Sequence, residues 1–393
     1  MRLRRPDLRA YRGVGLSRDV KALGWTSCFQ DVASEMVYPL LPQFILLLGG
    51  GAMALGVIES AAEGILAIVK GAAGGWSDRA GRRKPFVSAG YGLSALTRPF
   101  MAIAMAPVHI GLLRSLDRLA KGLRTAPRDA IIGEVTPTAQ RATAFSFHRG
   151  LDHLGAAIGP LVAAAILYLA PGRLRLVFAI ATIPAIVGWA IAQHSVREPR
   201  FAHTASQDPR AATPLPDQLK RPLAAFFIFS LGNASDAFLI LRADQLGWSP
   251  IQVTVLWSSF HVAKWLASAP GGRLADRIGP RQALLLGWSL YILAYLGFGA
   301  TASPVPVILL LGVYALYYGL AEGAERALIL DLGGSGLGTG RALGAFHLAS
   351  GLGTFAASML FGAIWELVGP AAAFVTGALL AGVAGLVLGR RRR

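Results

Sequence analysis

Apolar residues occur along the chain in long, almost uninterrupted runs that are separated by short polar segments. Runs such as LLLGWSLYILAYLGFGA and FVTGALLAGVAGLVLG approach the length of about 20 residues that a helix needs to cross a bilayer. Because lipid offers the backbone no hydrogen-bond partner, such runs predict helices. We place twelve membrane-spanning helices at 23–47, 53–73, 86–106, 108–130, 143–169, 176–195, 222–242, 252–271, 283–301, 304–328, 342–364 and 369–389.

The longest polar break in this pattern runs from His194 to Pro222 and is rich in proline and basic residues, which is typical of a solvated linker. It divides the spans into two sets of six. We therefore expect five parts: a basic tail at 1–22, a six-helix bundle at 23–195, a linker at 196–221, a second six-helix bundle at 222–389 and a basic tail at 390–393.

Composition and charge agree with a membrane protein. The chain is 54% hydrophobic and 15% charged, whereas globular domains are about one quarter charged. Most of the 38 Lys and Arg residues lie in the tails, the linker and the loops after even-numbered spans, and the opposite loops hold Arg173, Arg175 and Arg242. The positive-inside rule then places both termini in the cytoplasm, and we expect an integral protein of the bacterial inner membrane. A nucleic-acid-binding surface would not alternate loop by loop, so we expect no nucleic-acid partner despite the net charge of +17.

The two halves of the chain repeat one another. GGWSDRAGRR at 74–83 matches GGRLADRIGPR at 271–281, RATAFSFH at 141–148 matches RALGAFH at 341–347, and PRDAII at 127–132 matches ERALIL at 325–330. The three pairs keep their order and share nearly the same offset, which indicates a duplicated six-helix unit in parallel orientation.

These motifs resemble the Major Facilitator Superfamily. The segment GGWSDRAGRR lies between spans two and three, as the signature loop of that family does. Arg118 and Gly122 fit its fourth-span pattern, and Gly155, Gly159 and Pro160 form part of its antiporter motif. The resemblance implies an all-α fold of about twelve spans in two pseudo-symmetric bundles, with alternating access around a central site. It also implies a cytoplasmic hinge and charge-relay loop made by Gly74, Asp78, Arg79, Gly81, Arg82 and Arg83.

Span four carries an unusual density of charge. Its basic residues are Arg114, Arg118, Lys121, Arg124 and Arg128, and its acids are Asp117 and Asp129. At 100° per residue all seven fall on one face of a helix. Each charge would cost at least about 2.5–3.5 kcal/mol in hydrocarbon, so we expect this face to meet water, partners or substrate in a central cavity.

Acids at helical spacing elsewhere supply partners. Asp31 and Glu35, Glu59 and Glu63, and His148 and Asp152 are each one turn apart. Three interpretations of the central charges stay open: ion pairs that hold the helices together, proton coupling, and direct contact with substrate. Adjacent carboxyls resist simultaneous ionisation, so the proton-coupling candidates are Asp31, Glu35 and Asp152. The candidates for the substrate cavity are Glu63, Arg114, Arg118, Lys121, Asn233, Asp236, His261 and Lys264.

A second group of polar residues lies toward the cytoplasmic ends of the spans and is expected to form a salt-bridge gate. Its members are Arg124, Arg128, His148, Glu322, Glu325, Arg326 and His347. Arg326 echoes Arg128 and His347 echoes His148 across the halves, which suits a gate built from both bundles.

Other features bear on the energy source and ligand. No Gly-Lys dipeptide occurs, which excludes the P-loop pattern, and we interpret GGSGLGTG at 333–340 as a flexible loop. Tyr314, Tyr317, Tyr318, Trp257 and Trp265 offer an aromatic wall for an organic substrate or, alternatively, packing and interface anchors. Asp31, Glu35, His148 and Asp152 are an acceptable ligand set for a divalent transition metal, although the basic face of span four would repel a cation.

The sequence therefore predicts a secondary transporter that moves a small polar or anionic organic solute, coupled to protons and directed toward efflux by antiport. A transporter of divalent metal or metal chelate is one alternative, and a membrane receptor of the same fold that does not transport is another. We expect a monomer with no enzymatic activity, no cofactor and no resident metal, whose partners are the substrate, protons and the lipid bilayer.

Overall fold

The computed structural model describes residues 15–50, 52–198, 215–233, 250–301 and 305–390, together with the single positions 236, 238, 239, 242, 246 and 303. The regular elements in this part of the chain are helices, without a strand. Residues 1–14, 199–214 and 391–393 lie outside it. The expectations for the basic tails and for most of the linker therefore fall largely outside the described residues.

The first half of the chain forms one helical bundle. Its helices are α1 (Arg18–Val37), η2 (Tyr38–Leu40), α2 (Leu41–Leu47), α3 (Ala52–Ala80), α4 (Lys84–Ala102), α5 (Pro107–Glu134), η3 (Thr138–Gln140), α6 (Arg141–Leu169), α7 (Leu174–Ile180) and α8 (Thr182–Ser195). Prolines mark several of the boundaries: Pro107 occupies the first turn of α5, where its missing N–H costs nothing, and Pro39 lies in the 3₁₀ turn that ends α1.

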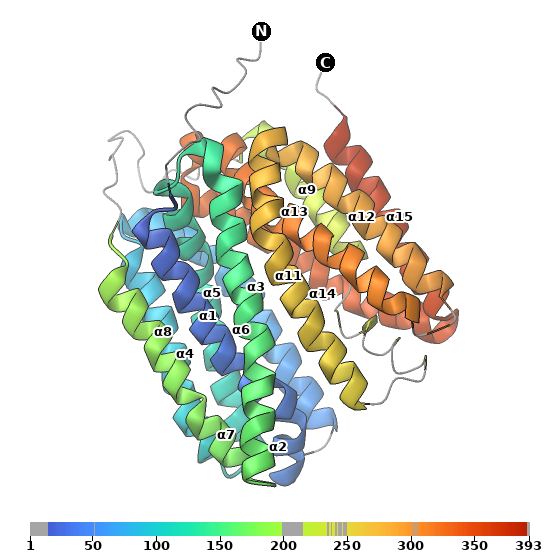
Figure 1. Cartoon of the computed structure of the whole chain (residues 1–393). Coiled ribbons are helices and arrows are strands. Elements are labelled where there is room, and N and C mark those ends of the chain that lie inside the picture. The colour runs from blue at the N-terminus through green and yellow to red at the C-terminus, as the bar shows by residue number, and fades with distance from the viewer. Residues whose placement is uncertain are drawn as a thin grey trace.

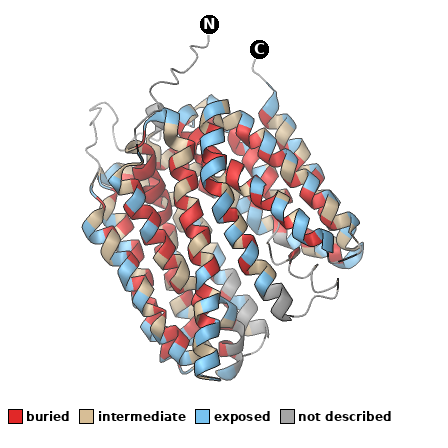
Figure 2. Cartoon of the chain, in the orientation of Figure 1, coloured by how far each residue is buried: buried red, intermediate tan, exposed pale blue. Residues whose placement is uncertain are grey.

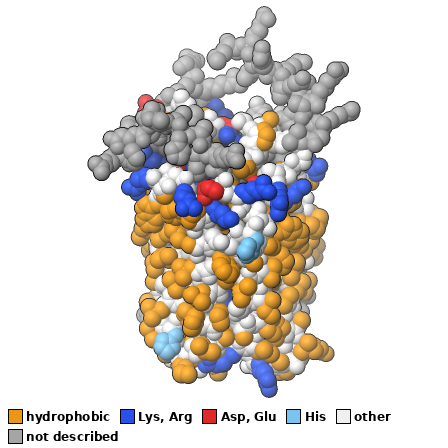
Figure 3. Space-filling model, turned by 90° about the vertical axis from the view of Figure 1, so that its left-hand side faces the viewer, with side chains coloured by type: hydrophobic (Ala, Val, Ile, Leu, Met, Phe, Trp, Pro, Cys, Tyr) orange, Lys and Arg blue, Asp and Glu red, His pale blue; other side chains and the backbone are white. Residues whose placement is uncertain are grey.

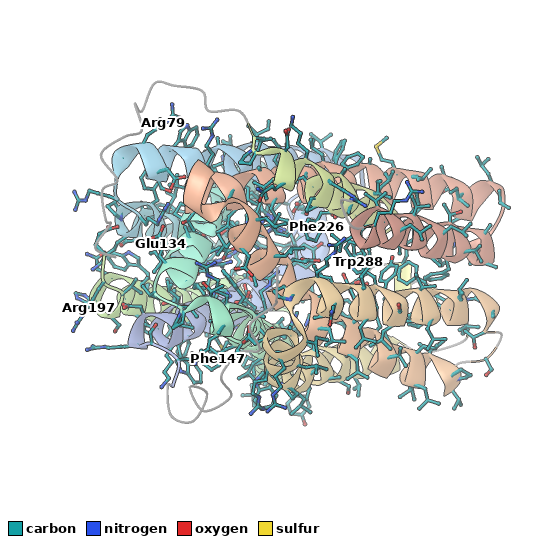
Figure 4. All side chains as sticks on the ribbon, turned by 90° about the horizontal axis from the view of Figure 1, so that it is seen from above. Arg79, Glu134, Phe147, Arg197, Phe226 and Trp288 are labelled. Carbon is teal, nitrogen blue, oxygen red and sulfur yellow. The ribbon has the colours of Figure 1, made fainter. Side chains whose placement is uncertain are left out.

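The second half repeats this arrangement. Its described helices are α9 (Asp217–Gly232), α11 (Pro250–Ile278), α12 (Pro280–Ala300), α13 (Val305–Leu337), α14 (Thr339–Leu367) and α15 (Pro370–Gly389). Pro280 and Pro370 begin α12 and α15, each directly after a glycine with positive φ. An aromatic cluster fills this bundle, and Phe226 packs edge to face on Trp288 with ring centroids 6.0 Å apart (Figure 4).

Two local expectations were wrong. The glycine-rich stretch at 333–340 is not a flexible loop, because α13 continues to Leu337 and α14 begins at Thr339, so that Gly338, with φ of +89°, makes the whole turn. The predicted signature loop is also mainly helical. Gly74, Asp78 and Arg79 lie in the last turns of α3, and the residues between α3 and α4 are 81–83. Glycine weakens a helix by only about 1 kcal/mol relative to alanine, which packing against a neighbouring helix offsets.

The two bundles lie side by side, and the first turn of α1 and the last turn of α15 point to the same end of the molecule, called here the termini end (Figure 1). At the boundary between the bundles α6 packs along α11 and α3 packs along α14. Buried residues concentrate inside each bundle and along this boundary, while the outer helix faces are exposed (Figure 2).

The outer surface is that of an integral membrane protein. Hydrophobic side chains cover the waist of the face in Figure 3, and Lys and Arg gather mainly toward the termini end. Within the described residues six helices are long and apolar enough to cross a membrane by length and composition. Helix α5 is not among these six, and its charged residues explain why.

Candidate functional site

The bundles are joined at the termini end by a carboxylate that accepts hydrogen bonds from the start of a helix in the other bundle. Asp78 at the end of α3 accepts from the backbone N–H groups of Gly340 (3.2 Å) and Arg341 (2.6 Å), in the first turn of α14. The N-terminus of a helix carries unpaired N–H groups and a partial positive charge, so it favours a carboxylate. Gly74 permits this approach, because a Cβ there would lie 1.9 Å from the carbonyl oxygen of Gly340. We call this contact the Asp78 latch.

Arg83 supports the Asp78 latch from within the first bundle. Its guanidinium lies 2.6 Å from Asp78 and binds both carboxylate oxygens of Glu134, at 2.6 and 3.0 Å. Burial acts against the charged form, but hydrogen bonds to Glu134 and the neighbouring Asp78 raise the pKa of Arg83 above its usual value. By contrast, Arg79 and Arg82 are exposed, and Figure 4 shows Arg79 at the rim, with Glu134 farther inside.

The duplicated motif forms a second contact of the same kind. Asp276 near the end of α11 accepts from the N–H groups of Ala142 (3.0 Å) and Thr143 (2.9 Å), in the first turn of α6. Arg141 pairs with Asp331 of α13 at 2.9 Å beside it. We call this the Asp276 latch. The two latches mirror each other: in each, an acid after an even-numbered span binds the start of a helix in the opposite bundle.

Deeper between the bundles, three basic side chains converge on Asp129 of α5. Its carboxylate is paired with Arg128 at 2.8 Å, with Arg326 of α13 at 3.1 Å and with His347 of α14 at 2.9 Å. Asp129 is 1% exposed, so each of these interactions is shielded from water. The structure thus brings together three of the predicted gate residues, Arg128, Arg326 and His347, on an acid that was not among the predicted site residues.

A second cross-bundle network links α6 to α13. Arg149 lies 2.7 Å from Asp152 and 3.3 Å from Glu322 of α13. His153 meets the same Glu322 at 2.8 Å, and His148 lies 3.7 Å from Asp152. Glu322 and His148, which were predicted at the gate, therefore belong to a network with Asp152, whereas the side chain of Glu325 has no ion-pair partner in the described part of the chain.

The second bundle holds a polar cluster within aromatic rings. Lys264 of α11 pairs with Asp236 at 3.2 Å and lies over the rings of Phe260 (4.1 Å) and Tyr318 (3.9 Å). Two tyrosine hydroxyls, those of Tyr314 and Tyr318, donate to Asp236. Of the other predicted cavity residues, Asn233 accepts a hydrogen bond from Tyr314 at 3.2 Å, and the ring of His261 packs edge to face on that of Trp257 at 5.0 Å.

The charged face of α5 is divided between several neighbours. Asp117 pairs with Arg98 of α4 at 3.3 Å and with Arg114 at 3.7 Å, and Arg118 pairs with Glu63 of α3 at 3.3 Å. Much of this face is therefore neutralised inside the first bundle.

Arg124 belongs to the same internal set rather than to the boundary between the bundles. It donates to Ser94 of α4 at 2.7 Å and lies over the ring of Tyr91 at 4.4 Å. Its described contacts lie within one bundle, as do those of Arg128 with Asp129 and Ser27, whereas Arg326 and His347 reach Asp129 across the boundary.

Within the predicted spans, five charged side chains have no ion-pair or hydrogen-bond partner in the described part of the chain: Asp31, Glu35, Lys70, Lys121 and Glu325. All five are partly exposed. The first two acids face α6 where Gly155 and Gly159 make room, since a Cβ at these glycines would lie 3.1 Å from the Cβ of Asp31 and 2.8 Å from that of Glu35. The partial antiporter motif is thus the surface against which the two acids pack.

Metal coordination finds no support in this geometry. Among the described residues no three His, Cys, Asp or Glu side chains form a group that could hold a metal ion. Asp31, Glu35, His148 and Asp152 do not form a ligand set, because Asp152 is paired with His148 and with Arg149 instead.

Sequence reasoning missed three acids of the site: Asp129, Asp276 and Glu134. A signal was present for the first two, since each lies in a segment that repeats between the halves. For Glu134, at the end of α5, the sequence gives no comparable signal, because its partner Arg83 is a neighbour only in the folded chain.

Two helical bundles with an apolar outer surface, joined by ion pairs between them, are the architecture of membrane transporters that are built from two structural repeats. The sequence profile of the Major Facilitator Superfamily matches residues 23–332 and 223–393, and the chain belongs to this family. An uncharacterized MFS-type transporter of Methanocaldococcus jannaschii is 32% identical over 386 residues, which cover 95% of this chain and 94% of that protein.

Two further comparisons are more distant. The multidrug resistance protein MdtG of Escherichia coli is 26% identical over 320 residues, covering 77% of this chain and 76% of that protein. The crystal structure of the human organic anion transporter MFSD10 superposes with a TM-score of 0.80 at 17% identity, over 96% of this chain and all of that one. The latter likeness shows the shared fold.

Proposed function

We propose that this protein is a proton-coupled secondary transporter that exports a small polar or anionic organic solute by alternating access. The observation that carries the proposal is that Asp31 and Glu35 are unpaired. Most other deep charges are paired, whereas these two carboxyls are partly exposed and have no partner in the described part of the chain. A carboxyl that water reaches from one side of the membrane can exchange a proton on that side. When the bundles close around it, an unpaired carboxylate without water is costly. Closure of the bundles therefore favours the protonated form, and the two events are coupled.

The contacts between the bundles support a rocking cycle. The Asp78 latch, the Asp276 latch and the Asp129 cluster are all non-covalent and lie toward the termini end. With both termini in the cytoplasm, as the distribution of Lys and Arg favours, these contacts close the cytoplasmic side and the structure represents an outward-facing state. Breaking them would open the other side without unfolding either bundle.

We also propose the direction of transport and the parts of the chain that move. The packing of Asp31 and Glu35 on the glycines of the partial antiporter motif, and the relationship to a protein named for multidrug resistance, favour export by antiport. We propose residues 23–195 and 222–389 as the two moving units of a monomer in the bacterial inner membrane, with 196–221 as the linker.

Proton flux in proteoliposomes tests the coupling. A panel of organic anions is applied to vesicles that contain a pH-sensitive dye, and we expect one or more members to move protons. Asp31→Asn and Glu35→Gln should lose the proton signal but keep counterflow of the substrate, since exchange needs no net proton movement. The matched control is Glu366→Gln, which removes an exposed acid on α14. Full proton flux in both variants would contradict the coupling role, and binding without counterflow would favour a receptor.

A further inference from the structure

The duplicated motif carries an arginine at the same place in both halves. In the match of 74–83 with 271–281, Arg83 corresponds to Arg281, since each lies two residues after the glycine that follows Asp-Arg. Both glycines have positive φ, +61° at Gly81 and +92° at Gly279, so each motif ends in a glycine turn before the next helix. The two arginines therefore occupy equivalent positions at the termini end of the two bundles.

The surroundings of these two arginines differ. The charge of Arg83 is matched by carboxylates, because Glu134 binds it through both oxygens and Asp78 lies 2.6 Å away. Arg281 has no ion-pair partner among the described residues and donates to two main-chain carbonyls at the end of α15. The second bundle thus has the arginine without the acids that balance it in the first.

The repeat shows which carboxylate is missing. Extending the match of 127–132 with 325–330 by two residues sets Glu134 opposite Leu332. An apolar side chain therefore occupies the position from which the first bundle supplies the counter-ion.

Arg281 and Leu332 line one cavity of about 220 Å³ at the termini end of the second bundle. In this bundle α15 packs along α9 and along α12 (Figure 1). Two more arginines line the same cavity, Arg221 from α9 and Arg390 directly after α15. Three guanidinium groups from three different helix ends thus surround the space beside Leu332.

The charges around this cavity do not cancel. Arg221 donates to the carbonyl of Val387 at 2.7 Å, and neither Arg221 nor Arg390 has an ion-pair partner in the described part of the chain. Of the described residues that line the cavity, the one acid is Asp217, which pairs with Lys220 at 2.7 Å. The carbonyl end of α15 adds about half a negative charge, which is small beside three guanidinium groups.

The arginines also keep N–H donors for a ligand. Arg281 uses Nη2 and Arg221 uses Nε for the carbonyls of α15, and their other nitrogens have no hydrogen-bond partner among the described residues. Both side chains are partly exposed and that of Arg390 is exposed, so an anion can reach them from water. The planar fork of N–H groups on a guanidinium matches the oxygens of a phosphate group in spacing and in charge.

We propose that this cavity binds the phosphate group of an anionic molecule, which balances Arg281 as Glu134 balances Arg83 in the first bundle. The site lies apart from the charged boundary between the bundles, and it does not depend on the proposed transport function.

Two sources share this chemistry, a dissolved phosphate compound and the head group of an anionic phospholipid. The cavity opens at the end of the molecule that carries most of the basic residues, where either can approach. On α15 the exposed side chains of Leu379, Val383 and Leu386 fall on one face and lead toward Arg390. Acyl chains of a lipid can lie along this face with the head group at the cavity.

Melting temperatures of the full chain in lipid nanodiscs test the proposal and distinguish the sources. The reference is phosphatidylcholine with sodium chloride. Inorganic phosphate replaces chloride at the same ionic strength in one arm, so that screening stays constant, and phosphatidylglycerol replaces part of the phosphatidylcholine in the other. A rise with inorganic phosphate assigns the site to dissolved phosphate, and a rise with phosphatidylglycerol assigns it to lipid. No rise in either arm would overturn the proposal.

Variants of Arg281 locate the effect. Arg281→Gln should weaken the binding of the stabilising probe at least about tenfold, as expected for loss of a charged hydrogen-bond partner. The matched control is Arg273→Gln, which removes an exposed arginine of α11 that does not line the cavity and should respond as the parent does. An equal response of Arg281→Gln and the parent would refute the assignment.

A second pair of variants keeps the test decisive if Arg281→Gln fails to fold. Leu332→Glu supplies within the chain the carboxylate that the first bundle has, and Leu332→Gln has nearly the same shape without the charge. In the reference nanodiscs Leu332→Glu should melt at a higher temperature than Leu332→Gln, and it should lose most of the response to the stabilising probe, whereas Leu332→Gln should keep it. Equal melting temperatures and equal responses of the two variants would contradict the proposal.

Discussion

The Asp276 latch gives the most quantitative prediction. In Asp276→Asn the side chain keeps one acceptor oxygen for the N–H groups of Ala142 and Thr143, and it loses the second acceptor and the negative charge. A hydrogen bond to a charged group contributes about 1.5–3 kcal/mol and a neutral one about 0.5–1.5 kcal/mol. The substitution should therefore weaken the closed arrangement at the termini end by about 2 kcal/mol, which corresponds to a shift of about 30-fold in the equilibrium between closed and open states.

The rate at which a cysteine at position 146 is labelled measures this shift. Ser146 on α6 is 2% exposed and lies against Gly272 and Gly323 of the other bundle, so a maleimide reaches it only when the bundles separate. In a Cys28→Ala, Ser146→Cys background, Asp276→Asn should speed labelling by about the same factor. Glu366→Gln serves as the control and should leave the rate unchanged. A labelling rate in Asp276→Asn equal to that of the parent would refute the reasoning, because the two hydrogen bonds would then contribute nothing to closure.

Two further predictions concern buried charge. Asp129→Asn leaves Arg128, Arg326 and His347 without their common carboxylate. We expect the free energy of unfolding to decrease by about 3–5 kcal/mol, the usual effect of breaking a buried ion pair, and this decrease should appear as a much lower melting temperature. An unchanged melting temperature would contradict the role given to Asp129. Asp236→Asn and Lys264→Met should each destabilise the protein, because each leaves the partner charge unpaired, and the double variant should be more stable than either single variant. The melting temperatures of the four proteins form a double-mutant cycle. Strictly additive effects would show that Asp236 and Lys264, 3.2 Å apart, are not coupled.

Sequence patterning accounts for most of the fold and part of the site. Apolar run length, the break after Ser195 and the repeated motifs are local signals, and the family and its helical fold followed from them. The shared offset of the repeats also pairs Arg128 with Arg326 and His148 with His347, which favoured a gate built from both halves. Asp129, the common partner of Arg128, Arg326 and His347, was less visible, because an acid that follows five basic residues on one helix has several potential partners until the second bundle is in place.

Packing decided the features that local sequence did not. The glycines at 333–340 favour a loop by composition, yet the helix continues because Gly333 packs against Leu219 of α9, where an added Cβ would lie 2.5 Å from that side chain. Periodicity placed the charges of α5 on one face, but it could not divide them among α3, α4 and the second bundle, because that division depends on where Glu63, Ser94 and Arg326 lie in space.

Distances at both ends of the molecule test the central claim of alternating access most directly. Spin labels at Arg79 of α3 and Arg273 of α11 report the separation of the bundles at the termini end, and labels at Leu169 of α6 and Val305 of α13 report it at the opposite end; all four positions are exposed. Pulsed electron paramagnetic resonance in lipid nanodiscs, between acidic and alkaline pH, should show two populations whose distances change in opposite directions at the two ends. A single, pH-independent distance at both ends, or distances that increase together, would contradict the account.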